Sequence, residues 1–151
     1  MKIIKADLSH TDDIARLFDL YRQFYQCEAD LPLATEFIRQ RLENNESVIF
    51  LAQNAQGEAL GFTQLYPSFC SVEAVKIFIL YDLYVENNGR RSGIGRKLMQ
   101  QATDYARENS APRLDLLTAK DNIPGQKLYE QQGYVKTNED FYAYSLAIKQ
   151  N

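Results

Sequence analysis

A basic, glycine-containing stretch near the middle of the chain has residue types suited to binding a phosphate group. It reads Arg90, Arg91, Ser92, Gly93, Ile94 and Gly95. An apolar run at residues 77–85 precedes it and a helical spacing of apolar residues follows it, which predicts a strand, a tight turn and a helix. Backbone N–H groups at a helix start bind anions, and glycines let those groups approach closely. We interpret the turn as a phosphate seat, to which Arg96 adds charge, with a plain polar loop as the alternative.

The common nucleotide motifs do not fit this turn. A dinucleotide-binding fingerprint needs a third glycine where Lys97 stands. A Walker loop ends in Gly-Lys-Ser/Thr, whereas this stretch continues as Gly95, Arg96 and Lys97. Both nucleotide-binding loops are therefore excluded.

The composition is that of an ordinary globular protein. The chain has 151 residues, of which 45% are hydrophobic and 25% charged, and we expect one domain over residues 1–151. A formal net charge of −3 argues against nucleic acid as a partner. His10 is the one histidine, and Cys27 and Cys70 lack the spacing of metal ligands, so no metal site is expected. Because no apolar run is long enough to span a membrane, we expect a soluble cytoplasmic protein with reduced cysteines.

Apolar spacing and turn residues divide the chain into strands and helices. Strands are expected at residues 3–6, 47–53, 59–66, 77–85, 113–119, 134–136 and 141–148. Helices are expected at residues 11–27, 32–43, 94–109 and 124–132. The second and third strands should form an antiparallel hairpin that ends at Pro67, and the form of residues 68–76 is left open.

This order of elements predicts an α/β (α+β) fold. The strand, helix and strand within residues 77–119 imply a right-handed parallel crossover. We expect a single mixed, mostly antiparallel sheet of about seven strands with about four helices.

Two motifs make the chain resemble the GCN5-related N-acetyltransferase (GNAT) superfamily over nearly its full length. Arg90-x-x-Gly93-x-Gly95 is similar to the family's loop Gln/Arg-x-x-Gly-x-Gly/Ala, which holds the pyrophosphate of acetyl-coenzyme A. A second signature is Asn-x-x-(small)-x-x-(apolar)-Tyr-x-x-x-Gly-(aromatic). It is met by Asn122, Gly125, Leu128, Tyr129, Gly133 and Tyr134. The resemblance implies acetyl-coenzyme A as co-substrate and a sheet whose central parallel pair is splayed.

The resemblance also implies a role for each matching residue. The turn and Arg96 would hold the pyrophosphate, and the backbone of three strand residues would pair with the pantetheine arm of the coenzyme. Those three residues are Leu83, Tyr84 and Val85. Tyr129 would be the general acid near the sulfur. Asn122 would contact the coenzyme, although a helix N-cap is an equally good interpretation of an asparagine at this position.

The general base is the open point of the resemblance. Transfer from a thioester needs a neutral amine, a polarised carbonyl and a proton for the thiolate. Small polyamine acetyltransferases of this superfamily have Glu-Asp where this chain has Tyr81 and Asp82. Asp82 is a candidate base, acting directly or through water, or a substrate contact, or a structural carboxylate in a buried strand. Tyr81 is assigned to the acceptor side.

The acceptor wall is expected at the end of the first helix and in the linker after it. The residues concerned are Tyr21, Tyr25, Glu28 and Asp30. Aromatic faces and carboxylates suit a cationic amine. Core tyrosines and solvated acids are the alternative interpretation.

The leading functional hypothesis is transfer of an acetyl group from acetyl-coenzyme A to an amine of a small molecule, such as an amino acid or polyamine. Direct attack in a ternary complex is the expected mechanism. The alternatives are a protein lysine or N-terminal acetyltransferase and a catalytically weak coenzyme A-binding sensor. Residues 141–146 resemble the chain ends of a branch related to yeast histone and amino-acid acetyltransferases, which implies a homodimer.

Overall fold

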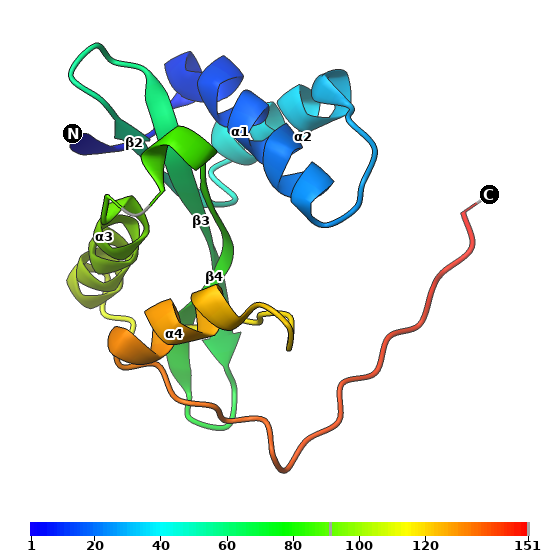
Figure 1. The fold of residues 1–151 in the computed structure, drawn as a ribbon. Coiled ribbons are helices and arrows are strands. Elements are labelled where there is room, and N and C mark those ends of the chain that lie inside the picture. Colours follow the sequence, from blue (N-terminus) through cyan, green and yellow to red (C-terminus); the bar gives the residue numbers. More distant parts are fainter. Residues whose placement is uncertain (91, 151) are drawn as a thin grey trace.

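Helices cover both faces of one mixed sheet in the computed structural model (Figure 1). The structure describes residues 1–90 and 92–150. The strands are β1 (Lys2–Lys5), β2 (Val48–Gln53), β3 (Ala59–Cys70), β4 (Val75–Val85) and β5 (Leu114–Asp115). The helices are α1 (Thr11–Phe24), α2 (Leu31–Glu43), α3 (Ile94–Glu108) and α4 (Ile123–Gln131), with short 3-10 helices η1 (Leu8–His10) and η2 (Asn87–Gly89). The predicted α/β class and the four helices are confirmed. None of the helices among these residues is long and apolar enough to cross a bilayer.

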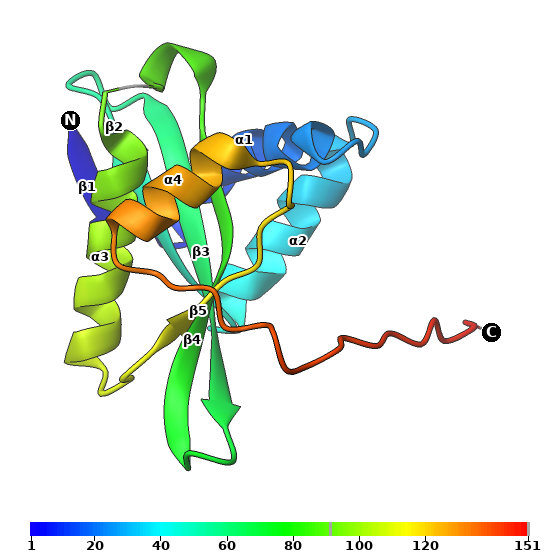
Figure 2. The ribbon, with the colours of Figure 1, turned by 60° about the horizontal axis from the view of Figure 1, so that its bottom comes forward.

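The sheet has five strands in the order β1-β2-β3-β4-β5, so the prediction of about seven was wrong. The first four are antiparallel to their neighbours, and β4 runs parallel to β5. The two missing strands were expected at residues 134–136 and 141–148. Tyr134 instead packs against the α3 cluster without forming a strand, and residues 141–148 run away from the body in an extended tail (Figures 1 and 2). A strand forms only where a neighbour accepts and donates its backbone hydrogen bonds, and the tail has no such neighbour among the described residues.

The β3–β4 hairpin is longer than expected, because β3 continues through Pro67 to Cys70. Proline cannot donate a ladder hydrogen bond and is tolerated at a sheet edge. β2 begins opposite Leu65, so this end of β3 has β4 as its one neighbour and Pro67 leaves no bond unmade. A tight turn closes the hairpin, with Ala74 N–H donating to the carbonyl of Ser71 at 3.1 Å. Residues 68–76, whose form the sequence left open, are thus the end of the β3–β4 hairpin.

β5 is shorter than the predicted strand at residues 113–119. It has only the two residues that pair with β4, namely Leu114 with Phe78 and Asp115 with Ile79. Beyond them the chain leaves the sheet and enters α4 (Figure 2). The apolar run therefore covers a partly exposed connection as well as a strand.

Two apolar clusters lie on opposite faces of the sheet. One packs α1 and α2 against residues that include Ile49, Leu51 and Phe62. The other packs α3 against residues that include Phe50 and Leu65. The predicted apolar stripe of α3 is buried there in full, at Ile94, Leu98, Met99, Ala102 and Ala106. β4 lies between these two layers, and the candidate site is built on it.

Candidate active site

The phosphate seat predicted from the sequence lies at the start of α3, directly after β4 and η2. Its N-cap is Gly93, with a φ of 82° in the left-handed region that favours glycine. No side chain of the described residues caps this helix start. The first N–H groups of α3 are therefore available to an anion. The Ser92 hydroxyl donates to the carbonyl of Gly89 and ties the turn to η2. Arg91 lies outside the described residues.

Both described arginines of the turn contact neighbouring elements. Arg90 donates from Nε to the carbonyl of Val85 at 2.8 Å, and its guanidinium lies 5.7 Å from the centre of the Tyr84 ring. Arg96 is exposed and donates to Oε1 of Gln131 at 3.5 Å, which links α3 to α4. The helix backbone is thus the first source of donors at the seat, and the arginines tie the seat to β4 and α4.

β4 separates from β5 halfway along its length. Phe78 and Ile79 pair with β5, whereas β4 stays paired with β3 as far as Val85. The backbone of residues 80–85 consequently has no strand partner on its β5 side among the described residues. An extended ligand can add to such an edge as another strand does. This edge includes the three residues predicted to pair with the pantetheine arm.

A bulge at Tyr81 sets which side chains of β4 face which layer. Gln64 pairs with Asp82 and Leu65 pairs with Leu80, so Tyr81 is an extra residue in β4. The extra residue reverses the usual alternation of side chains. Leu80 packs with the α3 cluster, while Asp82 interacts with Tyr21 of α1 on the opposite face.

Asp82 is buried and accepts hydrogen bonds from β3, in a network that ends at Ser47 just before β2. Its side chain accepts at Oδ2 from Gln64 Nε2 at 2.6 Å, and Gln64 Oε1 accepts from the Ser47 hydroxyl at 2.7 Å. Thr63 donates to the Asp82 carbonyl at 2.8 Å. Burial raises the pKa of Asp82 above its ordinary value, and the hydrogen bonds from Gln64 and Tyr21 oppose that rise. Asp82 is therefore a stronger base than a solvated carboxylate.

Tyrosines surround this carboxylate. The Tyr21 hydroxyl donates to the carbonyl of Tyr81 at 3.2 Å and interacts with the side chain of Asp82. The Tyr21 ring lies 5.1 Å from that of Tyr25, and the Tyr81 ring, 59% exposed as a residue, lies 5.4 Å from that of Tyr66. Burial and then the Asp82 charge raise the pKa of Tyr21 far above its ordinary value. Tyr21 is accordingly a neutral hydroxyl at any physiological pH.

α4 supplies the second predicted motif. The Asn122 side chain accepts from the N–H of Gly125 at 3.2 Å and donates to the Thr118 hydroxyl at 3.1 Å, so it acts as the N-cap of α4. A Cβ at Gly125 would collide with that cap, which explains the small residue three positions later. Burial raises the pKa of Tyr129, which interacts with Tyr25 and with Thr118.

Comparisons with known proteins show the family to which the chain belongs. The sequence matches the Acetyltransferase (GNAT) family over residues 14–134. The chain belongs to the GNAT family of acetyltransferases. It is 45% identical over 148 residues to the uncharacterized N-acetyltransferase YhfO of Bacillus subtilis (strain 168), covering 98% of each chain. It is 31% identical over 86 residues to the D-amino-acid N-acetyltransferase HPA3 of Saccharomyces cerevisiae, covering 57% of this chain and 53% of HPA3. A crystal structure described as a probable acetyltransferase has 39% identity and a TM-score of 0.91, with 100% of both chains covered.

This GNAT domain brings some of the predicted site residues together and separates others. Tyr21 interacts with Asp82 and Tyr129, and Tyr129 in turn interacts with Tyr25, so these four share one region. Glu28 is exposed in the linker between α1 and α2. Asp30, expected in the acceptor wall, has its carboxylate at the N-cap of α2, where it accepts from the N–H of Leu33 at 3.2 Å. Of the two acids predicted for the acceptor wall, Asp30 therefore serves as a helix cap.

The sequence-based interpretation missed Gln64 and Ser47. Gln64 is fully buried and holds Asp82, although nothing in its own type suggests a site. The sequence did contain a sign of this role, because Gln64 is an amide inside the apolar strand expected at residues 59–66. A polar side chain inside a sheet is rarely found without a hydrogen-bond partner. Ser47, at the start of the preceding strand, is its partner on the next strand.

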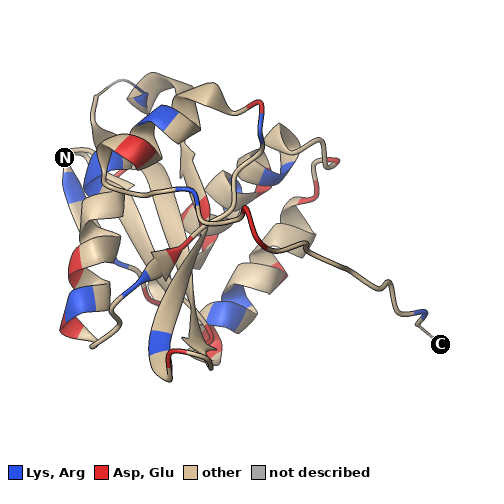
Figure 3. Cartoon of the chain, turned by 90° about the horizontal axis from the view of Figure 1, so that it is seen from below, with Lys and Arg blue, Asp and Glu red and all other residues tan. Residues whose placement is uncertain are grey.

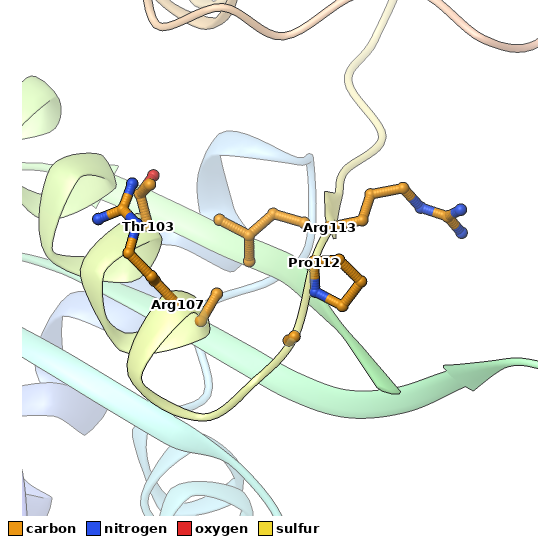
Figure 4. A pocket seen from close by; sticks show the side chains of 7 residues that line it. Thr103, Arg107, Pro112 and Arg113 are labelled. Carbon is orange, nitrogen blue, oxygen red and sulfur yellow. The ribbon is translucent and has the colours of Figure 1, made fainter. Parts of the chain in front are cut away.

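Two cavities lie away from these motifs. One, of about 220 Å³, lies between the end of α3 and β5 and is lined by Thr103, Arg107, Pro112 and Arg113 among others (Figure 4). The other, of about 600 Å³, lies beside β1 and the end of α2. Neither includes a residue of the two GNAT motifs. Among the described residues there is no group of three or more His, Cys, Asp or Glu that could hold a metal ion.

We expect Asn122→Ala to lower the free energy of unfolding by about 1 kcal/mol, because α4 loses its cap. Asn122→Ser should keep most of that stability, since serine caps helices as well. Urea unfolding of the three proteins measures the difference. If both variants keep full stability but bind coenzyme A more weakly, Asn122 is a coenzyme contact and the cap has no energetic role.

Proposed function

We propose that this enzyme transfers the acetyl group of acetyl-coenzyme A to a primary amine of a small molecule, with residues 1–151 acting as one domain. One observation supports the proposal: three features lie together along β4. They are the unpaired edge of β4, the start of α3 without a side-chain cap, and the buried carboxylate of Asp82 surrounded by tyrosines. The yeast relative named a D-amino-acid N-acetyltransferase supports an amine on a small molecule. The two alternatives, a protein acetyltransferase and a coenzyme A sensor, are outcomes of the test below.

The seat and the free edge fit the two parts of acetyl-coenzyme A. The N–H groups at the start of α3 and the arginines beside it suit the pyrophosphate. The backbone of residues 83–85 suits the amides of the pantetheine arm, because it offers an unpaired strand edge. In this arrangement the side chains of Leu83 and Tyr84 pack into opposite layers and only the main chain faces the coenzyme.

The residues around the site suit direct attack in a ternary complex. A protonated amine must lose a proton before it attacks, and an alkylamine has a pKa of about 10.4, so a base is needed at neutral pH. Asp82 has the raised pKa of a base, and Tyr129, whose pKa burial also raises, keeps its proton for the departing thiolate. The bond between amine nitrogen and acetyl carbon forms as the carbon–sulfur bond breaks.

The acceptor is proposed to bind against Tyr21, Tyr25 and Tyr81. These rings offer aromatic faces to a cation, and Glu28 and Asp82 supply negative charge nearby. In the view of Figure 3, both acidic and basic residues are found on the helices. A small cationic amine fits this surface better than a nucleic acid.

A panel of amines tests the proposal. Purified enzyme is incubated with acetyl-coenzyme A and amino acids, polyamines, aminoglycosides or lysine peptides, and free thiol is measured. We expect thiol release that depends on a small amine. Release with peptides alone would favour the protein acetyltransferase, and coenzyme A binding without any amine-dependent release would favour the sensor.

Tyr129→Phe should lower kcat roughly 100-fold, because the thiolate loses its proton donor. The dissociation constant for coenzyme A, measured by calorimetry, should stay within about twofold, since the ring is kept. Tyr134→Phe is the matched control. Its hydroxyl is buried without a hydrogen-bond partner among the described residues, and its ring lies 6.2 Å from that of Tyr129. An unchanged kcat for Tyr129→Phe would remove the general-acid assignment.

We further propose a cytoplasmic homodimer in which the C-terminal tail, residues 134–150, joins two copies. Large apolar side chains recur at every second position in the tail, at Tyr142, Tyr144, Leu146 and Ile148, which is the pattern of a half-buried strand. All are exposed in the single chain, Tyr144 at 93% and Leu146 at 84%. Residues 141–148 carry no charge (Figure 3). The free cysteines Cys27 and Cys70 suit a reducing compartment.

We propose a second copy of the chain as the partner of the tail, because each copy has an exposed sheet edge at β5 to which a strand can add. β5 is the last strand of the sheet, and Leu117 just beyond it is 87% exposed. Two copies related by a twofold axis could each add a tail strand to the β5 edge of the other. The likeness to the solved probable acetyltransferase spans the whole chain, residues 134–150 included.

Light scattering should give twice the mass of one chain for the wild type. The double variant Tyr144→Lys, Leu146→Lys should be a monomer, because charge replaces the apolar face, while Gln150→Lys should remain dimeric. A Leu117→Cys chain mixed with a Leu146→Cys chain, both with Cys27→Ser and Cys70→Ser, should crosslink through a bismaleimide. A monomeric wild type, or a dimer unaffected by the double variant, contradicts this assembly.

A further inference from the structure

Glu86 is the residue at which the chain leaves β4 on its way to the phosphate seat. Its N–H donates to the carbonyl of Leu60 at 2.9 Å, so its backbone is still held by β3. The three residues of η2 follow it directly, and α3 begins at Ile94. The placement of Glu86 therefore determines where the connection to the start of α3 begins.

An arginine of α1 holds the Glu86 carboxylate. Arg16 donates from Nη1 to Oε1 of Glu86 at 2.6 Å and from Nη2 to Oε2 at 3.4 Å. Nη2 also donates to the carbonyl of Ala59, the first residue of β3, at 3.0 Å. The two residues of the ion pair are 70 positions apart in the sequence, and their side chains are 44% and 24% exposed. Because the guanidinium donates to both carboxylate oxygens and to a carbonyl, its orientation is more restricted than that of a single surface contact.

A short series of contacts connects Glu86 to the start of α3. The carbonyl of Glu86 accepts from the N–H of Gly89 at 2.9 Å, and the carbonyl of Gly89 accepts from the Ser92 hydroxyl. Gly89 is buried, and a Cβ there would lie 3.1 Å from Cδ1 of Ile94 and 3.4 Å from Cγ1 of Val85. The backbone of η2 is thus packed between the end of β4 and the first residue of α3. A displacement of Glu86 would be transmitted to the helix start.

We infer that Arg16 is a positioning residue for the coenzyme. Through Glu86 it holds η2, and with η2 the N–H groups at the start of α3, in the arrangement that receives the pyrophosphate. The inference rests on the proposed function, which has the pyrophosphate bind at this seat. Arg16 acts without touching the coenzyme, because its guanidinium is engaged by Glu86 and by the carbonyl of Ala59.

Arg16→Met removes the guanidinium and keeps an apolar stem. We expect the dissociation constant for coenzyme A, measured by calorimetry, to rise about fivefold. The KM for acetyl-coenzyme A should rise by a similar factor, while kcat and the KM for the amine should stay within about twofold. The matched control is Arg39→Met, because Arg39 forms ion pairs within α2 and its side chain is 42% exposed. The control should bind coenzyme A as the wild type does, and an unchanged dissociation constant for Arg16→Met would overturn the inference.

Two further variants separate positioning from charge. Loss of Arg16 also leaves the Glu86 carboxylate unneutralised, four residues before Arg90 of the turn, and this charge would itself repel an anion. The double variant Arg16→Met, Glu86→Gln removes that charge, and we expect it to bind coenzyme A as weakly as Arg16→Met. Arg16→Lys keeps the positive charge without the forked geometry and should bind with intermediate strength. Wild-type affinity in both variants would mean that Arg16 only neutralises Glu86, which would contradict a positioning role.

Hydrogen exchange in the free protein tests positioning without coenzyme. The Gly89 N–H donates to the Glu86 carbonyl, so its exchange rate reports how firmly η2 is held. NMR should show faster exchange at Gly89 in Arg16→Met and in the double variant. The exchange of Leu98, buried inside α3, should be unchanged, and Arg39→Met should alter neither rate. Equal exchange at Gly89 in the wild type and in Arg16→Met would overturn the inference.

These measurements distinguish failure of the inference from failure of the proposed function. If the wild type binds no coenzyme A and releases no thiol with any amine, the proposed function is wrong. If the wild type does both and Arg16→Met matches it in affinity and in Gly89 exchange, the positioning role is wrong while the proposed function stands. Circular dichroism of each variant excludes unfolding as the cause, and Arg16→Lys supplies the comparison should Arg16→Met fail to fold.

Discussion

β4 keeps β3 as a hydrogen-bonded neighbour along its whole length but loses β5 after Ile79. This change of partners produces the two halves of the site from one strand. The unpaired edge of residues 80–85 is available to the coenzyme, and the bulge at Tyr81 turns Asp82 toward α1. A regular ladder would have paired the edge with β5 and placed Asp82 on the same face as Leu80. The proposed donor and acceptor sides therefore depend on two irregularities of β4, its separation from β5 after Ile79 and its bulge at Tyr81.

Burying the Asp82 carboxylate in the sheet also costs folding free energy. A buried carboxylate destabilises a fold unless hydrogen bonds compensate for its lost hydration. Asp82 has that compensation from Gln64, and Gln64 has it from Ser47. The network joins Ser47, just before β2, to β3 and to Asp82 of β4, the strand proposed to bind the donor. Stability and chemistry are coupled here, which is typical of buried polar networks.

Local patterns predicted the four helices well, because caps and apolar stripes depend on residues that are close together in the sequence. The apolar spacing that predicts α3 is an example. Contacts between segments that are distant in the sequence could not be predicted from such local patterns. The role of Gln64 depends on its register against Asp82, and the tail strands depend on a neighbour that a single chain does not supply. The strand was expected to end at Pro67, but a proline is tolerated there because β2 begins opposite Leu65 and does not pair with this part of β3.

The hydrogen bond from Arg90 to the carbonyl of Val85 changes how coenzyme affinity is to be understood. That carbonyl belongs to the edge on which the pantetheine arm is proposed to add, and Arg90 belongs to the turn proposed for the pyrophosphate. In the free protein the two halves of the donor site thus satisfy each other. Binding would exchange this internal hydrogen bond for hydrogen bonds to the ligand. The measured affinity is then the free energy of the bonds made to the ligand minus that of the internal bond that is lost. A residue that contributes to both states can be essential for recognition and still have a small net effect when it is removed.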